Sequence, residues 1–119
     1  MLKRAFLATF LSLNIIGTTP VAAAASAADG YVTGFVPLSN GIVFFFQNGT
    51  ISGSHPACDT GGLPQRWALD STTAAGQSLL SILLTAKSTH EILRIVGSGT
   101  CPTGGNSESI GILVTDDVQ

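Results

Sequence analysis

Two Asn-Gly pairs, Asn40-Gly41 and Asn48-Gly49, lie eight residues apart, and each stands between runs of β-forming residues. Asn-Gly is the strongest short signal for a β-hairpin, because both central residues of a type I′ turn need a positive φ. The flanking runs are residues 31–38, 42–47 and 50–52. The sequence therefore predicts a three-stranded antiparallel meander.

Two features of the first runs indicate where they lie in the sheet. Phe44, Phe45 and Phe46 are consecutive, and neighbouring side chains of a strand point to opposite faces, so both faces of the middle strand are predicted to be covered. Pro37 has no backbone N–H to donate. We therefore expect the first strand to lie at a sheet edge or to bend at this residue.

One helix is predicted, over residues 72–87. The segment 70–73 offers several N-cap oxygens, and Lys87 suits the negative end of the helix dipole. The apolar residues of the helix cover an arc of about 200°, which is broader than the usual stripe facing a core. The other face is polar but uncharged. Two alternatives stay open for it: contact with other copies in a ring, or a neutral solvated face on a monomer.

The remaining segments complete the order of elements. Residues 54–64 are rich in turn-forming residues and predict a loop. Short strands are predicted over 65–69, 91–96 and 109–115. This order favours an α+β fold with mostly antiparallel strands, in which about six strands form a small OB-like barrel with one central helix.

The N-terminal segment has the three-part layout of a secretory signal. Lys3 and Arg4 precede an uncharged run, and small residues around Ala25-Ser26-Ala27 form a cleavage site. The run is too short to span a membrane, which takes about 20 residues. The sequence predicts a signal peptide over 1–27 and a single exported domain over 28–119, either periplasmic or secreted. Cleavage after Ala24 or Ala25 stays open.

Removal of this leader leaves few charges. The segment 28–119 has three strongly basic and seven acidic side chains, a net charge of −4. Three scattered bases make no patch that could follow a phosphate backbone or an anionic membrane surface. We therefore expect no nucleic-acid partner and no membrane span in the mature chain.

Cys58 and Cys101 are the only cysteines, 43 residues apart. An exported protein meets oxidising conditions, so the two are predicted to form a disulfide. The alternative is a pair of free or metal-binding thiols. It is disfavoured because the chain has no C-x-x-C and no His at ligand spacing.

No set of residues predicts a catalytic, cofactor or metal site. His55 and His90 are the only histidines, and neither has a partner at a zinc-binding spacing, so both are expected at the surface or as helix caps. No serine stands in a nucleophile motif. We therefore expect a protein that is not an enzyme. A small hydrolase is the alternative, and it would need a triad assembled from distant residues.

Arg66 and Trp67 are adjacent and form the one candidate contact for a ligand or partner. Trp and Arg are enriched at binding hot spots, so together they could stack on a sugar or a partner side chain. In the favoured alternative, Trp67 fills the core between sheet and helix while Arg66 faces water.

Four features between Cys58 and Gly111 occur together: a Cys-containing loop, Arg66-Trp67-Ala68, Ser71-Thr-Thr-Ala-Ala-Gly76 opening a Leu-rich helix, and Arg94-Ile-Val-Gly-Ser-Gly-Thr-Cys101. This block resembles a group of small exported bacterial proteins. Members carry Asp-Thr-Glu before the last strand, where this chain has Asn106-Ser107-Glu108. In layout, the group is similar to the B subunits of AB5-type toxins, in the branch of subtilase cytotoxin and pertussis toxin.

The resemblance implies an OB fold, a pentameric ring whose helices line a pore, and binding of cell-surface glycans. No glycan-contacting residue can be carried over by position. The function expected from the sequence is an exported, non-enzymatic binding domain, with a homo-oligomeric ring and a glycan or protein partner. The alternative is a periplasmic inhibitor or stress protein that binds a partner enzyme through an exposed loop such as 54–64.

Overall fold

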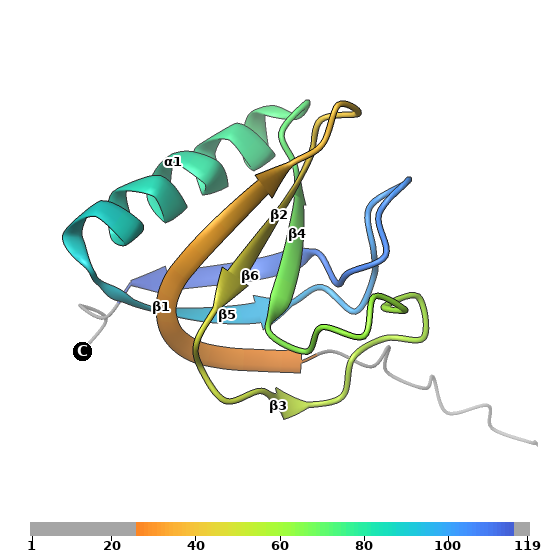
Figure 1. The fold of residues 1–119 in the computed structure, drawn as a ribbon, viewed down its shortest axis with the longest axis horizontal. Helices are drawn as coiled ribbons and strands as arrows, with labels where there is room; N and C mark the ends of the chain where they lie inside the picture. The colour runs from red at the N-terminus through yellow and green to blue at the C-terminus, as the bar shows by residue number, and fades with distance from the viewer. Residues whose placement is uncertain (1–25, 116–119) are drawn as a thin grey trace, which may run out of the picture.

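The computed structural model describes residues 26–115, which form an α+β domain of six strands and one helix (Figure 1). The strands form one sheet in the order β4-β2-β1-β5-β6, and β3 pairs with β1 beside this path. All strand pairs are antiparallel, so the predicted fold class is confirmed. The elements are β1 (Ser26–Pro37), β2 (Ile42–Gln47), β3 (Ser52–Gly53), β4 (Arg66–Asp70), α1 (Ala74–Thr89), β5 (Ile92–Gly97) and β6 (Ile110–Thr115).

The first strand, β1, is long, strongly curved and central (Figure 1). Its first half pairs with β5, and its second half pairs with β2. The register shifts between Val32 and Gly34, and such a bulge bends a strand. The prediction that β1 lies at an edge or bends at Pro37 is therefore wrong, because Pro37 is the last residue of the strand and the bulge lies earlier.

The first Asn-Gly pair is confirmed as the turn between β1 and β2, but the turn is one residue wider than predicted. Leu38 N donates to Ile42 O at 2.8 Å, which encloses three residues. Gly41 has φ 89°, whereas Asn40 is not among the residues with positive φ. Three-residue hairpins close in this way, with a glycine in the left-handed region after an ordinary turn.

The second Asn-Gly pair does not form a hairpin, so the predicted meander is wrong at its third strand. β3 pairs with β1, through Ser26 and Ala27, and not with β2. Asn48 Oδ1 accepts from Tyr31 N at 2.8 Å. A Cβ on Gly49 would overlap the backbone of Asp29. The pair therefore packs the chain against β1. As a result, β2 pairs with the second half of β1, and β3 pairs with the beginning of β1 along the same edge.

The two ends of the sheet, β4 and β6, come close without closing it. One isolated parallel bridge joins Ala68 to Ser109, and Ala68 N donates to Glu108 O at 2.9 Å. No ladder extends from this bridge among the described residues. The sheet is therefore not closed, and the predicted barrel is not confirmed.

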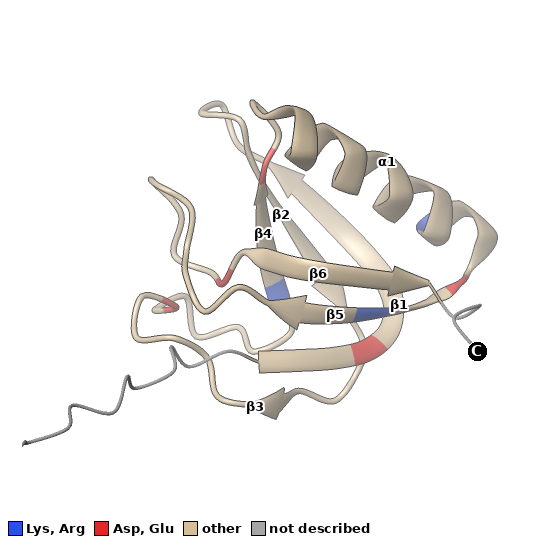
Figure 2. Ribbon diagram, turned by 180° about the vertical axis from the view of Figure 1, so that it is seen from behind, with Lys and Arg blue, Asp and Glu red and all other residues tan. Residues whose placement is uncertain are grey.

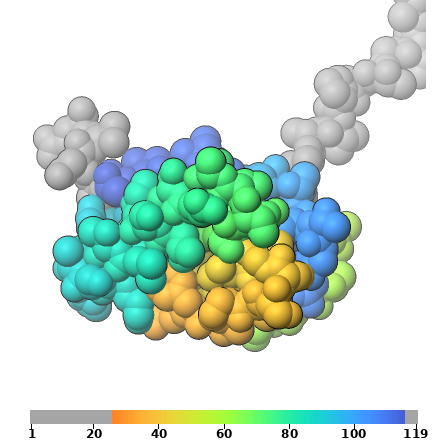
Figure 3. Space-filling model, turned by 90° about the horizontal axis from the view of Figure 1, so that it is seen from above, coloured from red at the N-terminus to blue at the C-terminus, as the bar shows by residue number. Residues whose placement is uncertain are grey.

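The core lies between the curved sheet and α1, which crosses one side of it (Figures 1 and 3). Trp67 is fully buried there, as the core interpretation of this residue predicted. The other largest fully buried apolar side chains are Phe45, Leu83, Leu93 and Ile95.

The helix α1 begins and ends within two residues of the predicted bounds. The Thr73 side chain accepts from Gly76 N at 3.0 Å and caps the first turn. His90 ends the helix in the left-handed conformation and stacks on Tyr31, which confirms its predicted role as a cap. No described helix is long and apolar enough to cross a membrane.

The predicted disulfide is confirmed. Cys58 and Cys101 are bonded, with Cα atoms 6.1 Å apart. Cys58 belongs to the loop between β3 and β4, and Cys101 to the loop between β5 and β6. The bond therefore joins the two long loops at one end of the sheet.

Replacing both cysteines, as Cys58→Ser/Cys101→Ser, is expected to lower the free energy of unfolding by about 4 kcal/mol, because a 43-residue cross-link no longer restricts the unfolded chain. Equilibrium urea unfolding measures the change. Wild type kept in reductant is the control and should match the double variant. An unchanged urea midpoint would contradict the prediction.

Hydrogen bonds from Thr72 lower the pKa of Asp70, first from its hydroxyl and second from its amide. The pKa of Asp70 is therefore lower in the folded protein than in the unfolded chain, which means that the ionised carboxylate stabilises the fold. This contribution is present above the unfolded-state pKa and is lost as the pH falls through the folded-state pKa. Thr72→Val is expected to raise the pKa of Asp70, as followed by NMR titration of its carboxyl carbon. Thr85→Val, also on an exposed surface, should leave that titration unchanged.

Candidate functional site

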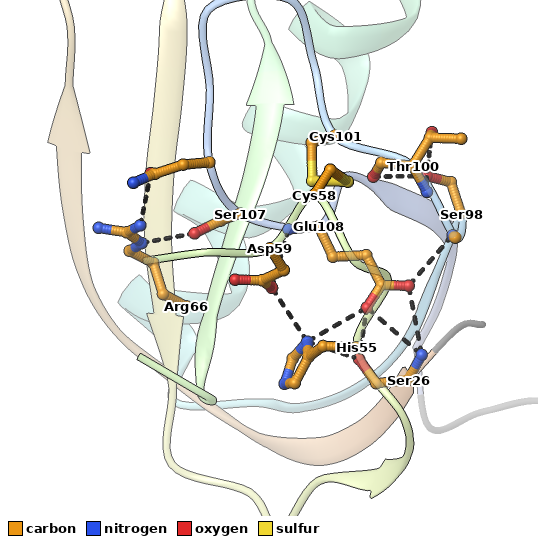
Figure 4. Close-up of a disulfide and its surroundings, with 12 residues drawn as sticks. Ser26, His55, Cys58, Asp59, Arg66, Ser98, Thr100, Cys101, Ser107 and Glu108 are labelled. Carbon is orange, nitrogen blue, oxygen red and sulfur yellow. Dashed lines mark hydrogen bonds and ion pairs between the residues drawn. A yellow bond between two sulfur atoms is a disulfide. The ribbon is translucent and has the colours of Figure 1, made fainter. Parts of the chain in front are cut away.

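Four polar side chains meet beside the disulfide (Figure 4). Ser26 begins β1, His55 and Asp59 lie in the loop between β3 and β4, and Glu108 precedes β6. Glu108 is 0% exposed and Ser26 is 1% exposed. A carboxylate is seldom fully buried unless it has partners, so its contacts define this group of four, called here the Glu108 cluster.

The Glu108 carboxylate accepts hydrogen bonds from two segments, the start of β1 and the loop after β5. Ser26 donates twice: its N lies 3.2 and 3.3 Å from the two carboxylate oxygens, and its Oγ lies 2.5 Å from Oε2. Gly99 N donates to Oε1 at 3.1 Å. A Cβ on Gly97 would overlap the carboxylate. Gly97 is therefore the residue that makes room for this buried group, a role beyond the turn geometry usual for glycine.

His55 is half-buried at the centre of the cluster, so the prediction of a surface histidine is wrong. Its Nδ1 lies 3.0 Å from Asp59 Oδ2, 3.3 Å from Glu108 Oε2 and 3.2 Å from Ser26 Oγ. Its Nε2 is buried and has no hydrogen-bond partner among the described residues. One ring nitrogen thus lies within hydrogen-bond distance of two carboxylates.

This geometry does not make a nucleophilic triad. A triad needs the serine on one imidazole nitrogen and the acid on the other, so that a proton moves through the ring. Here Ser26 and Asp59 approach the same nitrogen, and the Ser26 hydroxyl donates to Glu108. The cluster therefore offers no route by which His55 would activate Ser26.

The cluster has the ligand types of a metal site. His55 Nδ1, one Asp59 oxygen and one Glu108 oxygen lie within 4.8 Å of one another, and zinc binds this combination. Backbone donors already serve both carboxylates, however, since Glu108 N donates to Asp59 Oδ2 at 3.1 Å. The arrangement is satisfied by the chain's own donors, which favours a structural role.

A shallow pocket opens beside the cluster. Its volume is about 200 Å³, and its walls combine polar side chains with an apolar rim. Both contacts of the Asp59 carboxylate use Oδ2, and this side chain is 5% exposed at the wall of the pocket. The lining residues are His55, Asp59, Gly62, Leu63 and Pro64.

Arg66 does not form a stacking platform with Trp67, because Trp67 is buried. The Arg66 guanidinium donates to Ser107 Oγ at 2.6 Å and to Asn106 Oδ1 at 2.7 Å, and it lies 4.3 Å from the centre of the Phe44 ring. Arg66 therefore holds the turn that leads into Glu108 and supports the cluster from β4.

Glu108 and Asp59 are site residues that the sequence did not predict, and Ser26 belongs to β1 although it was predicted to lie in the leader. The spacing of His55 and Asp59, four residues apart in one loop, is the one local signal that pointed to a pair. Nothing local indicates Glu108, whose partners Ser26 and Asp59 lie 82 and 49 residues away.

Comparisons with models of protein families, with curated protein sequences and with solved structures gave no match. The resemblance to toxin B subunits therefore stays a prediction.

Gly97→Ala is expected to lower the free energy of unfolding by about 2 kcal/mol, because the new methyl group displaces the buried carboxylate. Gly34→Ala is the matched control: its Cβ would meet only a Phe46 ring carbon at 3.9 Å, so it should be neutral within about 0.5 kcal/mol. Urea unfolding of both variants measures the difference. Equal effects would show that Glu108 does not depend on this space.

Proposed function

We propose that this protein is an exported, non-enzymatic binding domain that assembles as a ring of identical copies and binds a carbohydrate. The observation that carries the proposal is the outward surface of α1, which has no charged residue apart from Lys87 and exposes Ile82 and Leu84 among polar side chains. The ring and the carbohydrate rest on separate features of the molecule.

The outward surface of α1 lacks the charges that a solvated helix usually carries. Lys87 is its one charged residue (Figure 2), and Lys87 Nζ donates to Thr33 O of β1 at 2.9 Å. Ile82 is 41% exposed and Leu84 is 49% exposed. Only part of the predicted apolar arc therefore faces the core, and the rest is available to a second copy.

This surface adjoins β6 across a groove of about 260 Å³. The groove is lined by Ser81, Ile82, Thr85, Glu91 and Thr115, the last at the end of β6. On β6, Ile112 is 58% exposed. β6 is also the last strand of the sheet, and a free strand edge is a template for pairing with another chain. Neighbouring copies in a ring would cover both α1 and β6.

The topology supports the toxin-like layout. β1 pairs on both sides, α1 lies between β4 and β5 in the chain, and the Ala68–Ser109 bridge brings the two ends of the sheet together. A partly open barrel with oligosaccharide-binding surfaces is typical of OB folds. The pocket beside His55 and Asp59 supplies polar groups with an apolar rim, which is the kind of lining that small-molecule sites use.

The solution mass tests the ring. Oxidised mature protein is expected to form an assembly of about five copies, measured by light scattering. Leu84→Ser is expected to produce monomers without loss of fold, because Leu84 is exposed in the single chain. Leu63→Ser is the matched control: Leu63 is 45% exposed in the loop before β4, and its replacement should leave the assembly intact. A monomeric wild type would overturn the ring.

A glycan panel then tests the ligand, with Asp59→Asn expected to abolish any binding that wild type shows. Binding that survives this substitution would place the ligand elsewhere.

One observation favours the inhibitor alternative. The loop over 54–64 is held at two points, by the Cys58–Cys101 bond and by the contacts of His55 and Asp59. A binding loop that is already rigid loses little entropy when it binds. A monomer that captures one enzyme from a periplasmic extract in a one-to-one complex, lost on Leu63→Ser, would favour this function.

A further inference from the structure

The Glu108 cluster has more buried negative charge than positive charge. Asp59 and Glu108 are two carboxylates with side chains 5% and 0% exposed. Among residues 26–115, His55 is the one basic side chain at ion-pair distance from either. The other donors to the Glu108 carboxylate are a hydroxyl and backbone amides, which are neutral, and a buried charge without a counter-charge is strongly destabilising.

The backbone nitrogen of Ser26 lies where the missing positive charge is needed. It is 3.2 Å from Glu108 Oε1 and 3.3 Å from Oε2, in a buried residue. As an internal amide, this nitrogen is neutral and shares one hydrogen between two oxygens. As a chain terminus, it would be an ammonium group with three hydrogens and a full positive charge.

The sequence before Ser26 permits such a terminus. Ala23-Ala24-Ala25 is an A-x-A site, equal in type to the site that ends at Ala27. Cleavage before Ala28 would remove Ser26, with its hydroxyl bond to Glu108, and Ala27, which pairs with Val96 of β5. Cleavage before Ser26 keeps both residues and creates the ammonium group.

We propose that export processing cuts the Ala25–Ser26 bond, and that the new α-ammonium group forms a buried ion pair with Glu108. Water adds across the peptide bond: its hydroxyl joins the Ala25 carbonyl carbon, its hydrogen goes to the Ser26 nitrogen, and that nitrogen takes up one further proton. The cleaved chain then has a positive charge against the buried Glu108 carboxylate. The uncleaved precursor has a neutral amide at that position, so removal of the leader completes the native state.

The first test is the N-terminus of the exported protein. The full chain is expressed in a bacterium, recovered from the periplasm or medium, and analysed by intact mass and N-terminal sequencing. The expected first residue is Ser26. A chain that begins at Ala25 or Ala28, or one that is not cleaved, would overturn the proposal.

The second test measures the ion pair. The oxidised domain is prepared with Ser26 as its first residue, and again with Ala25 added, which replaces the ammonium group by an amide. The added residue is expected to lower the folding equilibrium constant about 10-fold or more, because a charge-assisted contact is lost. With Glu108→Gln, the same addition should change the constant less than about 2-fold.

Asp29→Asn is the matched control, because Asp29 is an exposed carboxylate on the same strand, 3.7 Å from Arg94. In this background the added residue should keep its full effect. An effect of equal size with and without the Glu108 carboxylate would overturn the ion pair. If Glu108→Gln does not fold, the comparison between the chain that begins at Ser26 and the chain that begins at Ala25 still tests the ion pair. Equal stability of these two chains would overturn it.

Discussion

Burial of the Glu108 carboxylate is the interaction on which the arrangement of loops depends. Its side chain accepts from the start of β1 and from the loop after β5. Its main chain accepts from Ala68 of β4 and donates to Asp59. One residue therefore ties together four segments that are far apart in the sequence. Loss of any donor would leave a buried charge less compensated, so these segments are expected to lose their order together.

The disulfide and the cluster act on the same loops by different physical means. The Cys58–Cys101 bond joins the loop that carries His55 and Asp59 to the loop after β5, and it restricts mainly the unfolded chain. The polar contacts specify a single native arrangement of those loops. Arg66 adds a third support, through the turn before Glu108. The pocket beside His55 thus has walls held from several sides, as a binding site with little reorganisation requires.

The two surfaces that we assign to function lie at different ends of the domain and differ in their charge. The loop end carries the buried charges, the disulfide and the pocket, whereas α1 and β6 present exposed apolar side chains with little charge. In the ring that we propose, neighbouring copies would cover the exposed apolar side chains of α1 and β6, and the pocket beside His55 would stay open at the other end.

The sequence by itself determined the elements whose signals are local. The turn at Asn40-Gly41, the helix with its caps and the pairing of the two cysteines follow from turn chemistry, periodicity and the number of cysteines. Only the tertiary structure decided the path of β3, the central position of β1 and the Glu108 cluster. The physical reason is range: Asn48-Gly49 satisfies hairpin chemistry but packs against β1, and Glu108 is explained by Ser26, 82 residues away. Local conformational propensity describes which structure a segment can form by itself, whereas the burial of a charged side chain depends on the partners that the fold brings to it.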